Sequence, residues 1–115
     1  MARLRVALDA TPLIGEGTGV ATFTRGVLQA LAGLEGLDVS AWGLTVRGRG
    51  QLAAAVPAGV AVRDRPMPAG VLGRVWAKAP WPPGEWWTGD VAVIHGTNFV
   101  VPPTKRAATV VSVYD

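Results

Sequence analysis

The chain has 115 residues, enough to bury one hydrophobic core but not enough for two ordinary domains. Hydrophobic residues make up 50% of it and charged residues 17%, proportions that exclude a disordered chain. The absence of cysteine excludes disulfides and thiolate metal sites. With a single histidine, a zinc site would need carboxylates at spacings that the sequence lacks, so we expect no metal and no cofactor.

The formal net charge of +3 is distributed over short basic pairs and forms no long run. These pairs are Arg3/Arg5, Arg47/Arg49, Arg63/Arg65 and Lys105/Arg106. We interpret them as a solvated basic surface and expect no nucleic-acid partner, with a patch for an anionic partner as the alternative. The apolar run at the N-terminus is too short for a signal peptide, and no segment approaches the roughly 18 apolar residues of a membrane span. These features predict a cytoplasmic protein.

The first predicted element is a strand over Leu4–Leu8, mostly apolar and therefore expected to be covered on both faces. Pro12 and a glycine-rich stretch end it. Apolar residues then recur with helical spacing from Val20, with Thr18 as the expected N-cap and Gly33 near the end of the helix.

Further strands and short helical segments alternate along the rest of the chain. They are a strand over Val39–Val46, a helix over Gln51–Val56, a strand over Val60–Val62, a helical turn or two within Val71–Lys78, and strands at Val91–Ile94 and Ala108–Val113. This alternation predicts a Rossmann-like α/β domain, a parallel sheet flanked by helices on both sides. The strand at Leu4–Leu8 is expected to be central.

The segment from Pro66 to Gly89 is rich in proline and tryptophan and is otherwise predicted to be an irregular connection. Its tryptophans are expected to cover the sheet or to face a further domain. The alternative is a peripheral membrane contact near Arg74 and Lys78, which would suit a lipid-linked acceptor.

A glycine stands at every second position of Gly15-Glu-Gly17-Thr-Gly19, directly between the first strand and the first helix. Such a turn lets backbone N–H groups approach an anion closely, and the helix dipole favours negative charge there. The spacing matches neither the dinucleotide fingerprint nor a P-loop, which argues against a nicotinamide-dependent oxidoreductase. A turn that merely permits a tight connection remains the alternative.

A second motif, Asp90–Phe99, places the only histidine at the end of a predicted strand. His95, Thr97 and Asn98, with the backbone of Gly96, are then expected at the same sheet edge as the glycine turn. In open α/β sheets, ligands bind at the carboxyl ends of the strands. We therefore predict one shared cleft.

These segments together resemble the amino-terminal part of a retaining GT-B glycosyltransferase of the family 4 type. The matching segments are Asp9–Leu13 (DATPL), the Gly15–Gly19 loop with its following helix, Asp90–Asn98 (DVAVIHGTN), Pro102-Pro103 and Val110–Asp115 (VVSVYD). The resemblance covers nearly the whole chain except the tryptophan- and proline-rich middle.

The resemblance implies one of two facing Rossmann-like domains, spanning residues 1–115 and holding the acceptor, in a sugar-transferring enzyme of the hexosyltransferase type that requires no metal. It implies donor-phosphate contacts at Gly15, Gly17, Thr18 and Gly19, and acceptor-side positions at His95, Thr97, Asn98, Tyr114 and Asp115. Family members often have histidine where this chain has Tyr114, so a histidine role does not carry over to that position.

The chain stops just after a predicted strand, with no closing helix, which predicts a truncation that leaves out the donor-binding domain. We therefore expect the isolated chain to be inactive and its full-length form to transfer a sugar from a nucleotide-sugar donor to an unknown acceptor. The alternative is a non-catalytic α/β module that binds a phosphorylated ligand at the glycine loop.

Overall fold

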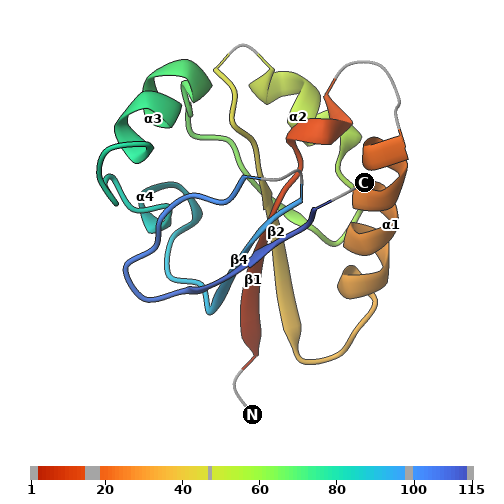
Figure 1. The fold of residues 1–115 in the computed structure, drawn as a ribbon. Coiled ribbons are helices and arrows are strands. Elements are labelled where there is room, and N and C mark those ends of the chain that lie inside the picture. Colours follow the sequence, from red (N-terminus) through yellow and green to blue (C-terminus); the bar gives the residue numbers. More distant parts are fainter. Residues whose placement is uncertain (1–2, 15–18, 47, 98–99, 114–115) are drawn as a thin grey trace.

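A computed structural model describes residues 3–14, 19–46, 48–97 and 100–113. Within these ranges, five parallel strands form one sheet in the order β3-β2-β1-β4-β5 (Figure 1). The strands are β1 (Leu4–Asp9), β2 (Leu37–Trp42), β3 (Ala61–Arg63), β4 (Val93–Gly96) and β5 (Ala108–Val111). The predicted central position of the first strand is confirmed.

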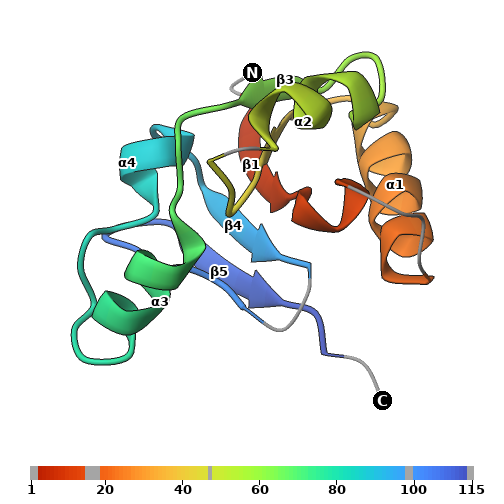
Figure 2. The same cartoon turned by 90° about the horizontal axis from the view of Figure 1, so that it is seen from above.

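Helices cover both faces of this sheet. They are α1 (Gly19–Ala32), α2 (Arg49–Ala55), α3 (Ala69–Trp76) and α4 (Glu85–Thr88), and a short 3-10 turn spans Thr11–Leu13. The pair α1 and α2 lies on one side of the sheet, and α3 and α4 lie on the other, as Figures 1 and 2 both show. The arrangement is a Rossmann-like α/β fold, as the alternation of elements predicts. No helix in the described ranges is long and apolar enough to cross a membrane.

The side chains of β1 alternate between two hydrophobic cores. Val6 and Leu8 enter the core formed with α1 and α2, whereas Ala7 enters the core formed with α3. A strand buried on both faces needs apolar residues at consecutive positions, which explains the apolar run in the sequence.

Several boundaries differ from the predicted ones. The second strand ends at Trp42 and not at Val46, because the backbone N–H of Leu44 turns away to donate to the Thr11 hydroxyl at 2.8 Å. The fourth strand runs from Val93 to Gly96, so His95 lies inside it and does not follow it. The connection after α3, for which the sequence predicts irregular structure, contains one helical turn, α4.

Two of the tryptophans in this segment cover the sheet. Trp76 and Trp87 pack against the core on the α3 side, and their indole N–H groups donate to the carbonyls of Pro82 at 2.9 Å and Pro66 at 2.8 Å. Trp81 and Trp86 are 57% and 49% exposed and contact each other edge to face. The covering role therefore applies to one pair, and the second pair presents its rings to solvent.

The first residue of α4, Glu85, ties that helix to the start of β5. Its carboxylate accepts hydrogen bonds from the backbone N–H groups of Lys105, Arg106 and Ala107. Burial acts to raise the pKa of Glu85, but these hydrogen bonds outweigh it and hold the pKa below its ordinary value of 4.5. The charged carboxylate thus stabilises the connection between α4 and β5.

Candidate functional site at the carboxyl edge of the sheet

The carboxyl ends of β1, β4 and β5 meet at one edge of the sheet, because all of these strands run in the same direction. Asp9 ends β1, Gly96 ends β4, and Ser112 follows β5 directly. This is the edge at which the sequence predicts a site.

Asp9 is a buried carboxylate at this edge, with 3% of its surface exposed. One of its oxygens accepts hydrogen bonds from the Thr11 backbone N–H at 2.8 Å and from the Thr11 hydroxyl at 2.5 Å. Burial raises the pKa of Asp9 from 3.8 to about 6, and the two hydrogen bonds from Thr11 oppose that rise. The carboxyl group therefore titrates near physiological pH. Shifted pKa values of this kind are found at functional sites and also at buried structural groups.

Thr97 connects β4 to β1 through its side chain. Its hydroxyl donates to the backbone carbonyl of Asp9 at 2.5 Å, and the residue is fully buried. The sequence places Thr97 on the acceptor side of a binding site. The structure places it next to Asp9, where its hydroxyl holds two strand ends together.

His95 lies within β4 and pairs in register with Leu8 on one side and Val110 on the other. Its Nε2 atom is 2.7 Å from the hydroxyl oxygen of Ser112. Burial lowers the pKa of His95 from its ordinary value of 6.5, so the neutral imidazole predominates at pH 7. A neutral ring can accept a hydrogen bond or a proton from a substrate hydroxyl.

Sequence reasoning missed Ser112 as a member of this group. The serine directly follows β5 and lies two residues beyond Val110, the register partner of His95; side chains two apart on an extended chain share a face. The period of two is visible in the sequence, but the register between β4 and β5 is not, and the register is what brings Ser112 to His95.

Gly96 is required by close backbone packing. A Cβ atom placed there would lie 1.8 Å from the backbone oxygen of Val100 and 2.6 Å from the carbonyl carbon of that residue. The Gly96 carbonyl also accepts a hydrogen bond from the backbone N–H of Ser112 at 2.8 Å. The glycine therefore lets the chain fold back over the end of β4.

Several predicted site residues lie outside the described part of the chain. They are Gly15, Gly17, Thr18, Asn98, Tyr114 and Asp115. Gly19 is described: it is the exposed first residue of α1, with open space where a Cβ would stand. The predicted cleft between the glycine loop and the Asp90–Phe99 motif remains a prediction. Two separate contacts are observed along this edge: Thr97 bonds to the Asp9 carbonyl, and His95 bonds to Ser112.

This arrangement offers one buried carboxyl group and one serine–histidine pair on neighbouring strands. Among the described residues, no group of three or more His, Cys, Asp or Glu side chains is placed to hold a metal ion. The chemistry that this edge supports directly is proton exchange and hydrogen bonding to a polar ligand.

The fold and the edge residues define a Rossmann-like α/β domain with polar groups at its carboxyl edge. Comparison of the chain with protein-family models, with curated proteins and with solved structures found no match.

Proposed function

We propose that this chain is the acceptor-side domain of a retaining GT-B glycosyltransferase of the family 4 type. In this proposal, the full-length form transfers a sugar from a nucleotide-sugar donor to an acceptor hydroxyl. The observation that carries the proposal is the position of His95 at the carboxyl edge of a parallel sheet, beside the end of β1 that leads toward the glycine loop.

His95 has the protonation state that this role needs. Because its pKa lies below 6.5, the neutral ring can hydrogen-bond an acceptor hydroxyl at neutral pH. The Ser112 hydroxyl, at 2.7 Å from Nε2, fixes the ring orientation. Sugar transfer also needs the donor held in a near-attack geometry, which in this fold requires groups from a second domain.

The test is to express the complete reading frame that encodes this chain and to assay release of nucleoside diphosphate from nucleotide sugars. We expect turnover by the full-length protein and none by residues 1–115 alone. Turnover by the purified 115-residue chain, with a contaminant excluded, would contradict the two-domain mechanism. Binding of nucleotide sugars without turnover by the full-length protein would favour the non-catalytic module.

A substitution at His95 tests its role in the full-length enzyme. His95→Gln keeps a group that can hydrogen-bond Ser112 but removes titration near neutral pH, so we expect kcat/KM to fall at least tenfold. Gln29→Ala, at an exposed position of α1, is the matched control and should leave kcat/KM unchanged. Equal activity of both variants would exclude His95 from the site.

A further inference from the structure

A second polar region lies away from the carboxyl edge, where the strands β1 and β2 begin. A cleft of about 440 Å³ opens there, with a lining that includes Arg3, Arg5, Asp38, Ser40 and Arg63. Arg3 precedes β1, and Asp38 is the second residue of β2, so this cleft begins at the amino-terminal end of these strands, and it reaches Arg63 at the end of β3.

The strand order explains how arginines far apart in the sequence line one cleft. Arg5 of β1 pairs in register with Asp38 near the start of β2, whereas Arg63 of β3 pairs with Trp42 at the end of β2, so the cleft extends along β2. The residues of these three strands in the cleft therefore come together only because the sheet has the order β3-β2-β1. In the sequence they look like separate basic pairs.

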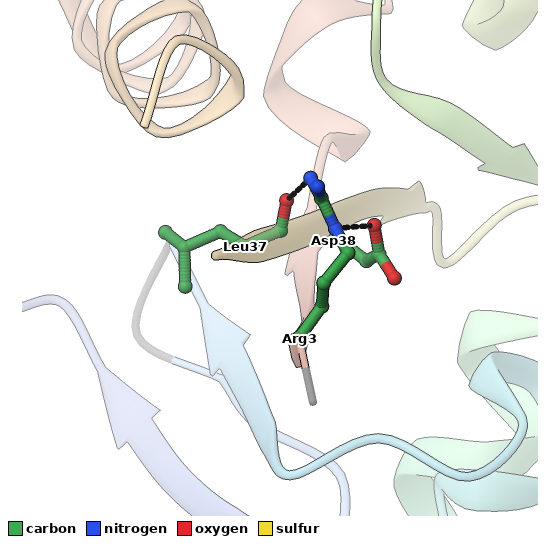
Figure 3. A network of polar contacts seen from close by, with 3 residues as sticks. All are labelled: Arg3, Leu37 and Asp38. Carbon is green, nitrogen blue, oxygen red and sulfur yellow. Dashed lines mark hydrogen bonds and ion pairs between the residues drawn. The ribbon is translucent and has the colours of Figure 1, made fainter. Parts of the chain in front are cut away.

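One of the three arginines is already paired. Arg3 Nε donates to the Asp38 carboxylate at 2.6 Å, and its Nη2 donates to the Leu37 carbonyl, also at 2.6 Å (Figure 3). These contacts hold the Arg3 side chain against the start of β2 and neutralise the Asp38 charge.

The other two arginines have no such partner. Within the described residues, no hydrogen bond or ion pair engages the guanidinium of Arg5 or of Arg63. Three arginines and one aspartate give the cleft lining a formal charge of +2. Guanidinium groups match the geometry of phosphate oxygens and stay charged at every accessible pH.

Ser40 adds a hydroxyl to the lining. It is 6% exposed, and its contact to the Val6 carbonyl is long, at 3.4 Å. A hydroxyl held this weakly can turn to a ligand oxygen at small cost.

We propose that this cleft binds a phosphomonoester through Arg5 and Arg63. A phosphomonoester carries a charge of about −1.5 to −2 at pH 7, which balances the charge of the lining. The cleft falls within the roughly 300–1,000 Å³ of small-molecule sites, so it has room for a molecule larger than the phosphate itself. That molecule is either a phosphorylated solute or a lipid with a phosphomonoester headgroup. This site is separate from the proposed transferase site and does not depend on it.

The test is an NMR titration of the ¹⁵N-labelled 115-residue chain with inorganic phosphate and with glycerol 3-phosphate, against sodium chloride at matched ionic strength. We expect saturable shifts at Arg5, Ser40 and Arg63 with both phosphates and none with chloride. Shifts that chloride reproduces, or the absence of shifts, would overturn the proposal.

Variants assign the binding to the two free arginines. Arg5→Gln and Arg63→Gln should each weaken glycerol 3-phosphate binding at least tenfold. Arg25→Gln, at an exposed position of α1, is the matched control and should bind as the parent chain does. Equal affinities in all three variants would contradict the assignment. Because Arg5 and Arg63 are exposed, we expect both variants to stay folded, which thermal unfolding of each checks.

Vesicles distinguish the two sources of the phosphate. Binding to vesicles of phosphatidic acid in phosphatidylcholine, reduced in Arg63→Gln but not in Arg25→Gln, would identify a lipid headgroup. Binding to glycerol 3-phosphate without vesicle binding would identify a soluble ligand. If Arg25→Gln and Arg63→Gln weaken vesicle binding equally, the binding depends on net charge alone. That result would overturn the proposal of a specific site.

Discussion

The two ends of the sheet use their polar groups in opposite ways. At the carboxyl edge, Asp9 and Thr97 are 3% and 0% exposed and are bonded to neighbouring strand ends or turns. At the amino edge, the side chains of Arg3 and Asp38 are 55% and 52% exposed. Asp9 and Thr97 at the first edge are therefore part of the fold, whereas the charged side chains at the second edge are largely accessible to solvent. Substitutions should cost folding free energy at the carboxyl edge and should leave stability nearly unchanged at the amino edge.

The largest effect is expected at Gly96. Gly96→Ala places a Cβ against the backbone of Val100, which cannot move aside as a side chain could. We expect a loss of at least about 3 kcal/mol in the free energy of unfolding, measured by urea denaturation.

A matched glycine in α1 provides the control. Gly26 lies in the helix interior with open space where a Cβ would stand, so Gly26→Ala should stabilise the chain by about 0.5–1 kcal/mol. If Gly96→Ala were as stable as the parent chain, the close packing at the end of β4 would be wrong.

The next effect concerns the pH dependence that Asp9 imposes. Its folded pKa of about 6 lies above the unfolded value of 3.8, so its contribution to stability is fully present below pH 3.8. That contribution is lost as the pH rises through 6, by about 3 kcal/mol in total. Asp9→Asn keeps an oxygen that can accept both hydrogen bonds from Thr11 but removes the ionisation. It should therefore abolish this part of the dependence of the unfolding free energy on pH.

The measurement is the free energy of unfolding of both proteins from pH 3 to pH 8. The difference between the two profiles isolates Asp9, because the other titrating groups are common to both chains. Parallel profiles would show that Asp9 does not carry a raised pKa and that the carboxyl edge is more hydrated than its burial indicates.

The sequence predicts the layers of this fold better than it predicts the contacts between them. The apolar run of β1 shows a buried central strand, because a strand covered on both faces has no polar side to display. The bond from Thr97 to Asp9 joins residues 88 positions apart, and no local pattern encodes it. The same holds for Arg63, which lines the same cleft as Arg5 only because of the strand order. Local periodicity therefore predicts the helices and strands. Which residues come together in a site depends on strand register and strand order, which local periodicity does not encode.

Glu85 tests whether a charge far from the carboxyl edge can still be structural. Glu85→Gln keeps the side-chain shape but loses the charge that three backbone N–H groups share, so we expect a loss of about 1–2 kcal/mol at pH 7. Because the folded pKa lies below 4.5, the contribution of Glu85 is present above pH 4.5 and is lost as the pH falls through the folded pKa. The two proteins should therefore converge in stability at low pH. A difference that persists undiminished at pH 2 would point to packing and not to charge.

The smallest effect is expected for the ion pair between Arg3 and Asp38. Although Arg3 Nε lies only 2.6 Å from the Asp38 carboxylate, both side chains are more than half exposed, so solvent screens their attraction. Arg3→Gln should lower the free energy of unfolding by about 0.5 kcal/mol or less, and added salt should reduce even this difference. The same variant leaves Asp38 without its partner in the cleft and removes one positive charge, so it should weaken phosphate binding while stability stays nearly constant. A stability loss above about 2 kcal/mol would show that the amino edge is as structural as the carboxyl edge, and the contrast between the two ends of the sheet would not hold.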